Sequence, residues 1–281
     1  MFDPRTTKYA YPLNTDGHYM EVKMDRGIVF DENYPYFDKS KSFLFKKAMV
    51  RFLCYLIVFP LTRARLGLIV KGRKNLRKNK KLIKGGVISV CNHVHLFDYL
   101  GITLAIKPVH PNVLVWDKNV NGDSGPLVRL VGGVPIPENN PKATHVFLKS
   151  IEEQLDNHGW IHLYPEGSMW EYYAPIRPFK KGAAFFACRF NRPIIPMAYS
   201  YRKPTFIRKI FFKQPARFTL NIGKPLFPNN ALPLAEREHD LTVRMHEAVC
   251  DLAGYMPMQN IYEPVFFNSK RVDYYTDTYG K

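Results

Sequence analysis

VISVCNHVHLFDYL, residues 87–100, contains the change of pattern that decides the predicted fold. The run 87–91 is apolar and rich in β-branched side chains, which is typical of a buried strand. Residues 96–106 instead have the pattern of a helix. Asn92 and His93 lie where the two patterns meet, and Asp98 follows five residues after His93. We therefore predict an imidazole and a carboxylate at the junction of a strand and a helix.

The spacing limits how His93 and Asp98 can meet. On one continuous helix of about 3.6 residues per turn, residues five apart lie roughly 140° apart around the axis. The two side chains can therefore meet only across a turn, which the change of pattern supplies. Side chains at strand ends are held by the sheet and commonly line a binding cleft.

Other interpretations of this stretch stay open. A histidine beside an apolar run is often an ordinary core or turn residue. His95 precedes Asp98 by three residues and would face it on a helix. A metal site made by His93, His95 and Asp98 would need more ligands, and no other cluster of histidine, cysteine or acidic residues supplies them. We predict no metal.

Strand and helix patterns alternate through the rest of the chain. This alternation predicts an α/β fold with a mostly parallel central sheet flanked by helices, whose working residues lie at the carboxyl ends of the strands. Strands are predicted at 112–116, 160–164, 197–201 and 217–222, and helices at 126–131, 142–157, 183–190 and 234–252.

The length and composition suit one α/β domain with appendages, because 281 residues with 46% hydrophobic side chains can build one large core. We predict an irregular extension over 1–40, with a short strand at 19–24, and a membrane-interface helix segment over 41–64. The α/β domain follows over 65–254 and an irregular tail over 255–281.

The formal charge of +17 indicates a polyanionic partner such as nucleic acid, an anionic membrane or a phosphorylated substrate. The four cysteines are widely spaced, and we expect reduced thiols in a cytosolic setting. The first residues lack the basic-then-apolar order of a signal peptide, so export is not expected. No apolar stretch reaches the about 18 uncharged residues of a membrane-spanning helix.

Residues 42–62, SFLFKKAMVRFLCYLIVFPLT, are predicted to lie in a membrane interface. The apolar side would insert while Lys46, Lys47 and Arg51 face the headgroups. Residues 71–84, KGRKNLRKNKKLIK, hold eight basic residues and no acid, which favours an anionic surface. A buried core helix for the first segment and a solvated loop for the second are the alternatives.

A second predicted strand end carries YPEGS, residues 164–168. Proline and glycine on either side of Glu166 indicate a tight turn with exposed backbone N–H groups. Arg177, Lys180 and Lys181 then precede a predicted helix, and basic side chains beside a helix start suit a phosphate. An ordinary surface turn is the alternative.

Four short motifs occur in the following order along the chain: His93-x4-Asp98, GGVPI at 132–136, YPEG at 164–167 and PIIP at 193–196. Together they resemble the motifs of the glycerolipid acyltransferase family typified by 1-acylglycerol-3-phosphate acyltransferase. The resemblance covers roughly residues 65–225, and RPFKKGA at 177–183 is similar to the sequence that follows the family's Glu-Gly motif.

The resemblance implies transfer of a fatty acyl chain from acyl-CoA or an acyl-carrier protein to a lysolipid hydroxyl, on the cytosolic face of a membrane. It implies His93 as general base and Asp98 as its orienting partner, with no metal or cofactor and no nucleic acid partner. The residues that we predict to bind substrate are Asn92, Lys118, Gly133, Glu166, Gly167, Ser168, Arg177, Lys180 and Lys181.

The chain departs from the family pattern at two positions. Glu138 and Met169 stand where the family usually has arginines that bind the acceptor phosphate. The acceptor is therefore either a lysophospholipid held by other cations or a different lysolipid or aminolipid. Hydrolysis of a lipid thioester by the same base is an alternative activity. The segment RKPTFIRKIFFK, residues 202–213, together with the net charge, motivates a more distant alternative, a nucleic-acid-binding module.

Overall fold

The computed structural model describes residue 4, residues 11–12, 17–18 and 25–254, and the backbone of residues 265–267 and 270–272. The predicted strand at 19–24 lies outside these residues. The elements along the chain are α1 (Lys41–Leu53), a π-helical turn η1 (Cys54–Val58), α2 (Phe59–Leu66), β1 (Ile69–Lys71), α3 (Arg73–Lys78), α4 (Lys80–Ile83), β2 (Val87–Val90), α5 (Asp98–Ala105), β3 (Asn112–Trp116), α6 (Asp117–Asn121), α7 (Gly125–Val131), β4 (Gly133–Ile136), α8 (Pro141–Asp156), β5 (Trp160–Leu163), α9 (Gly182–Phe190), β6 (Ile194–Arg202), α10 (Phe206–Ile210), β7 (Arg217–Ile222), α11 (Leu234–Ala253), β8 (Val265–Phe267) and β9 (Lys270–Val272).

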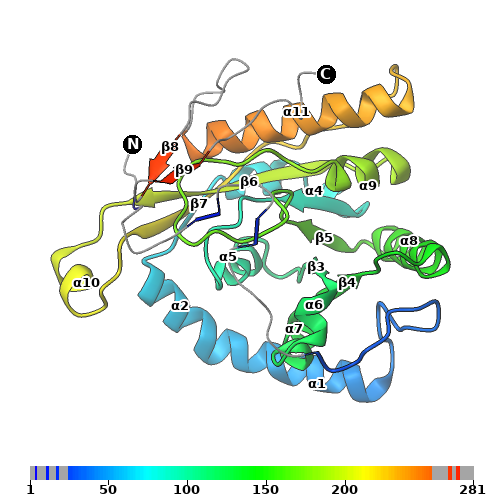
Figure 1. Ribbon diagram of the computed structural model, residues 1–281, viewed down its shortest axis with the longest axis horizontal. Helices are drawn as coiled ribbons and strands as arrows, with labels where there is room; N and C mark the ends of the chain where they lie inside the picture. The colour runs from blue at the N-terminus through cyan, green and yellow to red at the C-terminus, as the bar shows by residue number, and fades with distance from the viewer. Residues whose placement is uncertain are drawn as a thin grey trace.

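Seven of the described strands form one sheet in the order β1-β7-β6-β2-β5-β3-β4 (Figure 1). Neighbouring strands are parallel except for β6 and β7, which are antiparallel. The prediction of a mostly parallel α/β sheet is confirmed. The tail predicted as irregular instead contains an antiparallel pair, β8 and β9.

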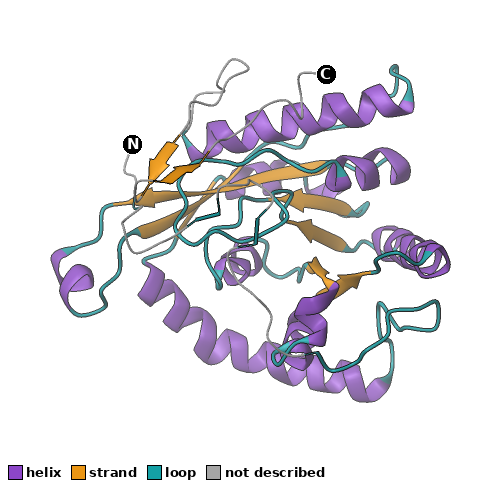
Figure 2. Ribbon diagram, in the orientation of Figure 1, coloured by secondary structure: helices purple, strands orange, loops and turns teal. Residues whose placement is uncertain are grey.

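Helices cover both faces of this sheet (Figure 2). Alternate residues of β2 face opposite sides, so that Val87 packs in one core cluster and Ile88 in the other. The first cluster includes Ile102 of α5, whereas the second includes Ile151 of α8 and Met245 of α11. Because both faces are covered, β2 and β5 are uninterrupted apolar or aromatic runs apart from Ser89 and His162.

The segment predicted to lie in a membrane interface is helical throughout, as α1, η1 and α2. Neither α1 nor η1 has a buried residue, so the alternative of a buried core helix is wrong for them. Phe59, Thr62 and Leu66 of α2 are buried and attach the segment to the domain. The basic stretch 71–84 forms α3 and α4 rather than a loop. None of the helices in the described part of the chain is both long and apolar enough to cross a membrane.

The sheet brings the predicted site segments to one edge. Residues 92–98 follow β2, residues 117–118 follow β3 and residues 164–168 follow β5, and these three strands run parallel. All three segments therefore leave the sheet at its carboxyl edge. All four cysteines are free thiols, and Cys91, Cys188 and Cys250 are buried while Cys54 is half-buried.

Gly86 directly precedes β2 and lies against the last turn of α8. Its φ is +87°, and a Cβ there would lie 2.1 Å from the carbonyl oxygen of Leu155. Gly27 has a φ of +67° but nothing within 4 Å of an added Cβ. Both glycines have the left-handed backbone conformation, but an added Cβ would clash with a neighbouring residue only at Gly86.

We expect Gly86→Ala to lower the free energy of unfolding by about 3 kcal/mol or more, because the backbone cannot move away from Leu155 without shifting β2. Gly27→Ala should cost about 1 to 2 kcal/mol, the cost of the backbone conformation alone. Urea denaturation followed by circular dichroism measures both. Equal losses for the two variants would show that α8 does not constrain β2.

Candidate active site

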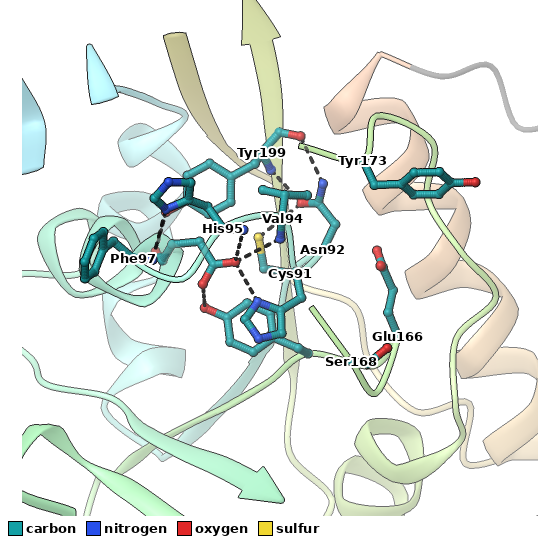
Figure 3. A network of polar contacts seen from close by, with 12 residues as sticks. Cys91, Asn92, Val94, His95, Phe97, Glu166, Ser168, Tyr173 and Tyr199 are labelled. Atoms are coloured by element: carbon teal, nitrogen blue, oxygen red, sulfur yellow. Dashed lines mark hydrogen bonds and ion pairs between the residues drawn. The ribbon is translucent and has the colours of Figure 1, made fainter. Parts of the chain in front are cut away.

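His93 and Asp98 meet across the turn between β2 and α5. The Nδ1–H of His93 donates to Asp98 Oδ2 at 2.7 Å, and the side chain of His93 is 25% exposed while that of Asp98 is 1% exposed. The turn is closed by the backbone N–H of Asp98 donating to His95 O at 3.0 Å. The backbone N–H of Val94 donates to Asp98 Oδ2 at 3.0 Å, within the network around Val94 and His95 in Figure 3. In this hydrogen bond the proton stays on Nδ1 of His93. Nε2 therefore carries no proton and is the basic nitrogen of the ring.

Asp98 is held as a carboxylate despite its burial. Burial raises the pKa of this group, but the imidazole of His93 and hydrogen bonds from His93, Tyr164 and Val94 outweigh it, so the pKa lies below the ordinary value. A buried carboxylate with this many donors acts as a fixed negative charge. It orients the imidazole and stabilises the imidazolium that forms when Nε2 takes a proton.

Tyr164 is a site residue that sequence reasoning missed. Its hydroxyl donates to Asp98 Oδ1 at 2.7 Å, and its ring stacks on His93 with centroids 3.9 Å apart and an interplanar angle of 13°. Tyr164 follows β5, beside β2, so the sheet holds it against the His93–Asp98 pair. An aromatic hydroxyl at the strand end directly before Pro165 was the available signal.

His95 faces a different part of the molecule. Its Nδ1 accepts the backbone N–H of Phe97 at 3.0 Å, and its ring packs against Tyr172 and Phe218. Only the backbone of His95 approaches Asp98, with N to Oδ2 at 3.4 Å. Burial lowers the pKa of this imidazole. The alternative pairing of the His95 and Asp98 side chains is therefore wrong.

Asn92 links two strands rather than facing a substrate. Its Oδ1 accepts the backbone N–H of Tyr199 at 2.7 Å, and its Nδ2 donates to the carbonyl of Tyr199 at 3.1 Å. The side chain is buried, and Tyr199 in turn donates its hydroxyl to the carbonyl of Asp98 (Figure 3). Asn92 thus fixes the end of β2 against β6, which corrects its predicted role in binding substrate.

Glu166 and Arg177 form a buried ion pair inside the YPEG turn. Arg177 donates from Nε and Nη2 to Glu166 Oε2 at 3.0 and 2.8 Å, and from Nη1 to Ser168 Oγ at 2.9 Å. Its guanidinium also lies 4.4 Å from the centroid of the Trp170 ring. Burial raises the pKa of Glu166 to about 7, against the opposing effect of Arg177. All three side chains are buried in this cluster and bond to one another, and their contacts with substrate stay a prediction.

The two predicted glycines differ in position. Gly167 has a φ of +80°, and a Cβ there would lie 3.0 Å from Lys180 Nζ, so this lysine lies over the turn at the carboxyl edge. Gly133 begins β4, at the amino edge, and its Cβ would lie 2.5 Å from Val128 of α7. Gly133 permits close packing of α7 on the sheet. Gly133 therefore lies at the edge of the sheet opposite to the His93–Asp98 pair, and its contact with substrate stays a prediction.

Exposed cations surround the carboxyl edge. Lys118 lies 4.7 Å from the centroid of the Trp116 ring, and His18 stacks on the same ring at 4.3 Å. Burial, followed by the charges of Lys180 and Lys118, lowers the pKa of His18. Lys181 and Glu138 are exposed, and Met169 is half-buried. Of the predicted phosphate-binding lysines, Lys118 lies in α6, directly after β3, and Lys180 lies over Gly167, so both are at the carboxyl edge.

A second residue that sequence reasoning missed is His162, buried in β5 under Tyr164. Its Nδ1 lies 2.7 Å from Ser89 Oγ, which also accepts Trp160 Nε1–H at 2.6 Å. The hydroxyl of Ser89 thus links His162 to Trp160, and among the described residues Nε2 of His162 is buried with no hydrogen-bond partner. Burial lowers the pKa of His162 to about 3, so the imidazole is neutral. Alternation within the strand WIHL would have placed it on the face shared with Trp160.

The internal role of Arg177 predicts a stability effect. Arg177→Met should lower the free energy of unfolding by about 3 to 5 kcal/mol, because Glu166 and Ser168 lose their buried donor and Glu166, whose pKa then rises further, has to take up a proton. The matched variant Lys180→Met removes an exposed cation and should change it by less than about 0.5 kcal/mol. Denaturant unfolding measures both. Unchanged stability of Arg177→Met, with a raised KM, would support the predicted role in binding substrate.

Comparison with known proteins agrees with the motifs. The profile of the Acyltransferase family matches residues 67–200. A 1-acyl-sn-glycerol-3-phosphate acyltransferase of Helicobacter pylori is 28% identical over 127 residues, which make up 44% of this chain and 52% of that protein. The chain thus spans about half the length of this curated relative.

Among solved structures, the 1-acyl-sn-glycerophosphate (LPA) acyltransferase PlsC of Thermotoga maritima is similar, with 19% identity and a TM-score of 0.41. The superposition covers 64% of this chain and 70% of that chain. The residues that match the family profile include His93, Asp98 and the YPEG turn. These are the segments that follow β2 and β5 at the carboxyl edge of the sheet. Residues 67–200 of this chain are thus similar to the Acyltransferase family, and they include the motifs that resemble those of glycerolipid acyltransferases.

Proposed function

We propose that this protein transfers a fatty acyl chain from a thioester to a hydroxyl of a lysolipid, with His93 as general base. The observation that carries the proposal is the buried Asp98 carboxylate holding Nδ1 of a partly exposed His93 at 2.7 Å. This arrangement directs the basic Nε2 outward, where an acceptor hydroxyl can reach it. The donor is acyl-CoA or an acyl-carrier protein, and the reaction uses no metal or cofactor.

In the proposed reaction the imidazole of His93 carries out both proton transfers. Nε2 of His93 takes the hydroxyl proton as the acceptor oxygen bonds to the thioester carbonyl carbon. When the tetrahedral intermediate collapses, the C–S bond breaks and the thiolate takes the proton back from the imidazolium. Asp98 stabilises the imidazolium between these steps without itself accepting a proton.

An anionic acceptor such as 1-acylglycerol-3-phosphate is proposed because exposed cations gather beside the pair. Lys118 and Lys180 both lie at the carboxyl edge, and Lys181 is exposed next to Lys180. A phosphate placed there would be bound by lysines rather than by arginines at positions 138 and 169. The named acceptor of the relative from Helicobacter pylori has such a phosphate.

We further propose that the protein acts as a monotopic enzyme on an anionic, cytosol-facing membrane surface. The apolar side chains of α1 and η1, including Phe45, Phe52 and Leu56, are exposed. Leu96 and Phe97, in the turn between His93 and α5, are exposed as well. A lipid acceptor would then pass from the bilayer to the imidazole without crossing water.

The function is tested with a labelled acyl thioester and a panel of lysolipids with and without a phosphate headgroup. We expect acylation of a phosphate-bearing lysolipid, and a drop in kcat of about 100-fold or more in His93→Ala. His95→Gln is the matched control and should keep kcat, because its side chain does not reach Asp98. Circular dichroism confirms that both variants fold.

The opposite pattern, an inactive His95→Gln and an active His93→Ala, would overturn the assignment of the base. Release of free fatty acid with no lysolipid acylated would show a thioester hydrolase. Acylation of an uncharged lysolipid alone would leave the reaction in place but exclude the proposed phosphate-binding role of Lys118 and Lys180.

Tyr164 is proposed as a positioning residue. Tyr164→Phe keeps the stacked ring but removes the donor to Asp98, and hydrogen bonds to charged groups contribute about 1.5 to 3 kcal/mol. We expect kcat to fall about tenfold or more with KM unchanged. Tyr36→Phe, which loses a hydroxyl bonded to backbone carbonyls away from the site, is the control and should keep kcat. An unchanged kcat in Tyr164→Phe would show that the hydroxyl does not position the pair.

A further inference from the structure

The connection between β6 and β7 carries a short helix, α10, that projects from the domain at the left of Figure 1. None of its residues is buried. Phe206 is 77% exposed and Phe211, directly after the helix, is 75% exposed. Ile207, Ile210 and Phe212 are also at least half exposed. Large apolar side chains of α10 and of the two residues after it thus lie in solvent, and only the half-buried Arg208 of this helix faces the domain.

The base of this projection is fixed to the domain. Arg208 donates from Nη1 to the carbonyl of Arg65 at 2.6 Å and to Gln214 Oε1 at 3.3 Å. The backbone N–H of Gln214 donates to the carbonyl of Arg208 at 3.1 Å, and the side chain of Gln214 is buried. These hydrogen bonds hold α10 in a defined position, and Phe206 and Phe211 are exposed in that position.

The anchoring bond places α10 beside α2. Arg65 lies in the last turn of α2, which Figure 1 shows next to α10. Exposed apolar side chains continue from there along α2, η1 and α1. This set, called the apolar band below, comprises Leu61, Ile57, Leu56, Leu53, Phe52, Met49 and Phe45. The apolar tip of α10 therefore adjoins a much longer apolar surface.

Basic side chains border the projection. Lys203, Lys209 and Lys213 are exposed, and the segment 202–213 has no acidic residue. Exposed apolar side chains with exposed lysines on and beside the same helix match a bilayer interface, in which acyl chains lie next to anionic headgroups.

We propose that α10 is a second membrane-inserting element, which binds anionic bilayers together with the apolar band of α1, η1 and α2. The hydrophobic tip enters the acyl-chain boundary, and the three lysines bind lipid phosphates. Insertion of α10 at one end of the apolar band adds a second contact, which fixes the orientation of the domain on the membrane more closely than a single helix lying in the interface does. The proposal goes beyond the acyl-transfer reaction and does not depend on it.

The same chemistry disfavours the other occupants of this surface. Single-stranded nucleic acid stacks its bases on aromatic rings, but Ile207 and Ile210 on the same turn offer no ring. A second copy of the chain would bring Lys203, Lys209 and Lys213 of both copies together, and like charges repel. A bilayer with anionic lipids satisfies the apolar residues and the lysines at once.

The test is sedimentation of the full chain with lipid vesicles in the absence of any acyl donor or acceptor. Phe206→Ser/Phe211→Ser should weaken partitioning onto phosphatidylglycerol-containing vesicles at least about tenfold, because two large apolar side chains no longer insert. Phe227→Ser is the matched control, since this phenylalanine is 51% exposed but lies beside Arg244 of α11, and should bind like the wild type. Lys203→Gln/Lys209→Gln/Lys213→Gln should weaken binding to these vesicles but not to pure phosphatidylcholine vesicles, and added salt should remove the difference.

Equal partitioning of the double serine variant and the wild type would overturn the proposal. So would a wild type that dimerises through α10 in analytical ultracentrifugation, or one that binds single-stranded RNA but not vesicles. Acyl transfer to a lysolipid in detergent micelles, measured separately, should be the same in the double serine variant and the wild type. If the wild type transferred no acyl group, the proposed reaction would fail, but the vesicle assay would still test the insertion of α10.

Discussion

The carboxylate of Asp98 is the group on which the site depends. A buried carboxylate without partners would cost several kcal/mol, and Asp98 avoids this cost by accepting bonds from His93, Tyr164 and the backbone of Val94. These donors come from the turn after β2 and from the end of β5, so the register of two parallel strands determines whether the carboxylate is satisfied. The same bonds orient the imidazole, and the fold and the proposed chemistry therefore rest on one set of contacts.

Around this pair, polar residues divide into those that hold the edge of the sheet and those that face outward. Asn92 bonds to the backbone of Tyr199, and Arg177 bonds to Glu166 and Ser168, so these residues fix the loops beside the pair. Lys118 and Lys180 instead lie at the surface of the same edge. Arginine, with its planar fork, suits the buried ion pair, and lysine suits an exposed site for phosphate.

The apolar surface follows a comparable division. The side chains of α2 that face the domain, Phe59 and Leu66, are buried, whereas those of α1 and η1 are not. An exposed apolar surface of this extent is typical of a site for a partner or a membrane. The apolar band and the tip of α10 are joined through the bond between Arg208 and Arg65, which connects segments far apart in the sequence.

The sequence by itself determined the α/β class, the strands 112–116 and 217–222, and the candidate pair His93 and Asp98, because hydrophobic periodicity and turn residues are local signals. Spacing alone left both His93 and His95 as partners for Asp98, and His93 was favoured only by the resemblance of the motifs. Only the tertiary structure decided that, by packing His95 against Phe218 of β7. It also decided that Tyr164 joins the pair, that Arg177 is buried and that Gly133 lies at the opposite edge. Each of these depends on which strands are neighbours and in which direction they run, and that information is carried by contacts between distant residues.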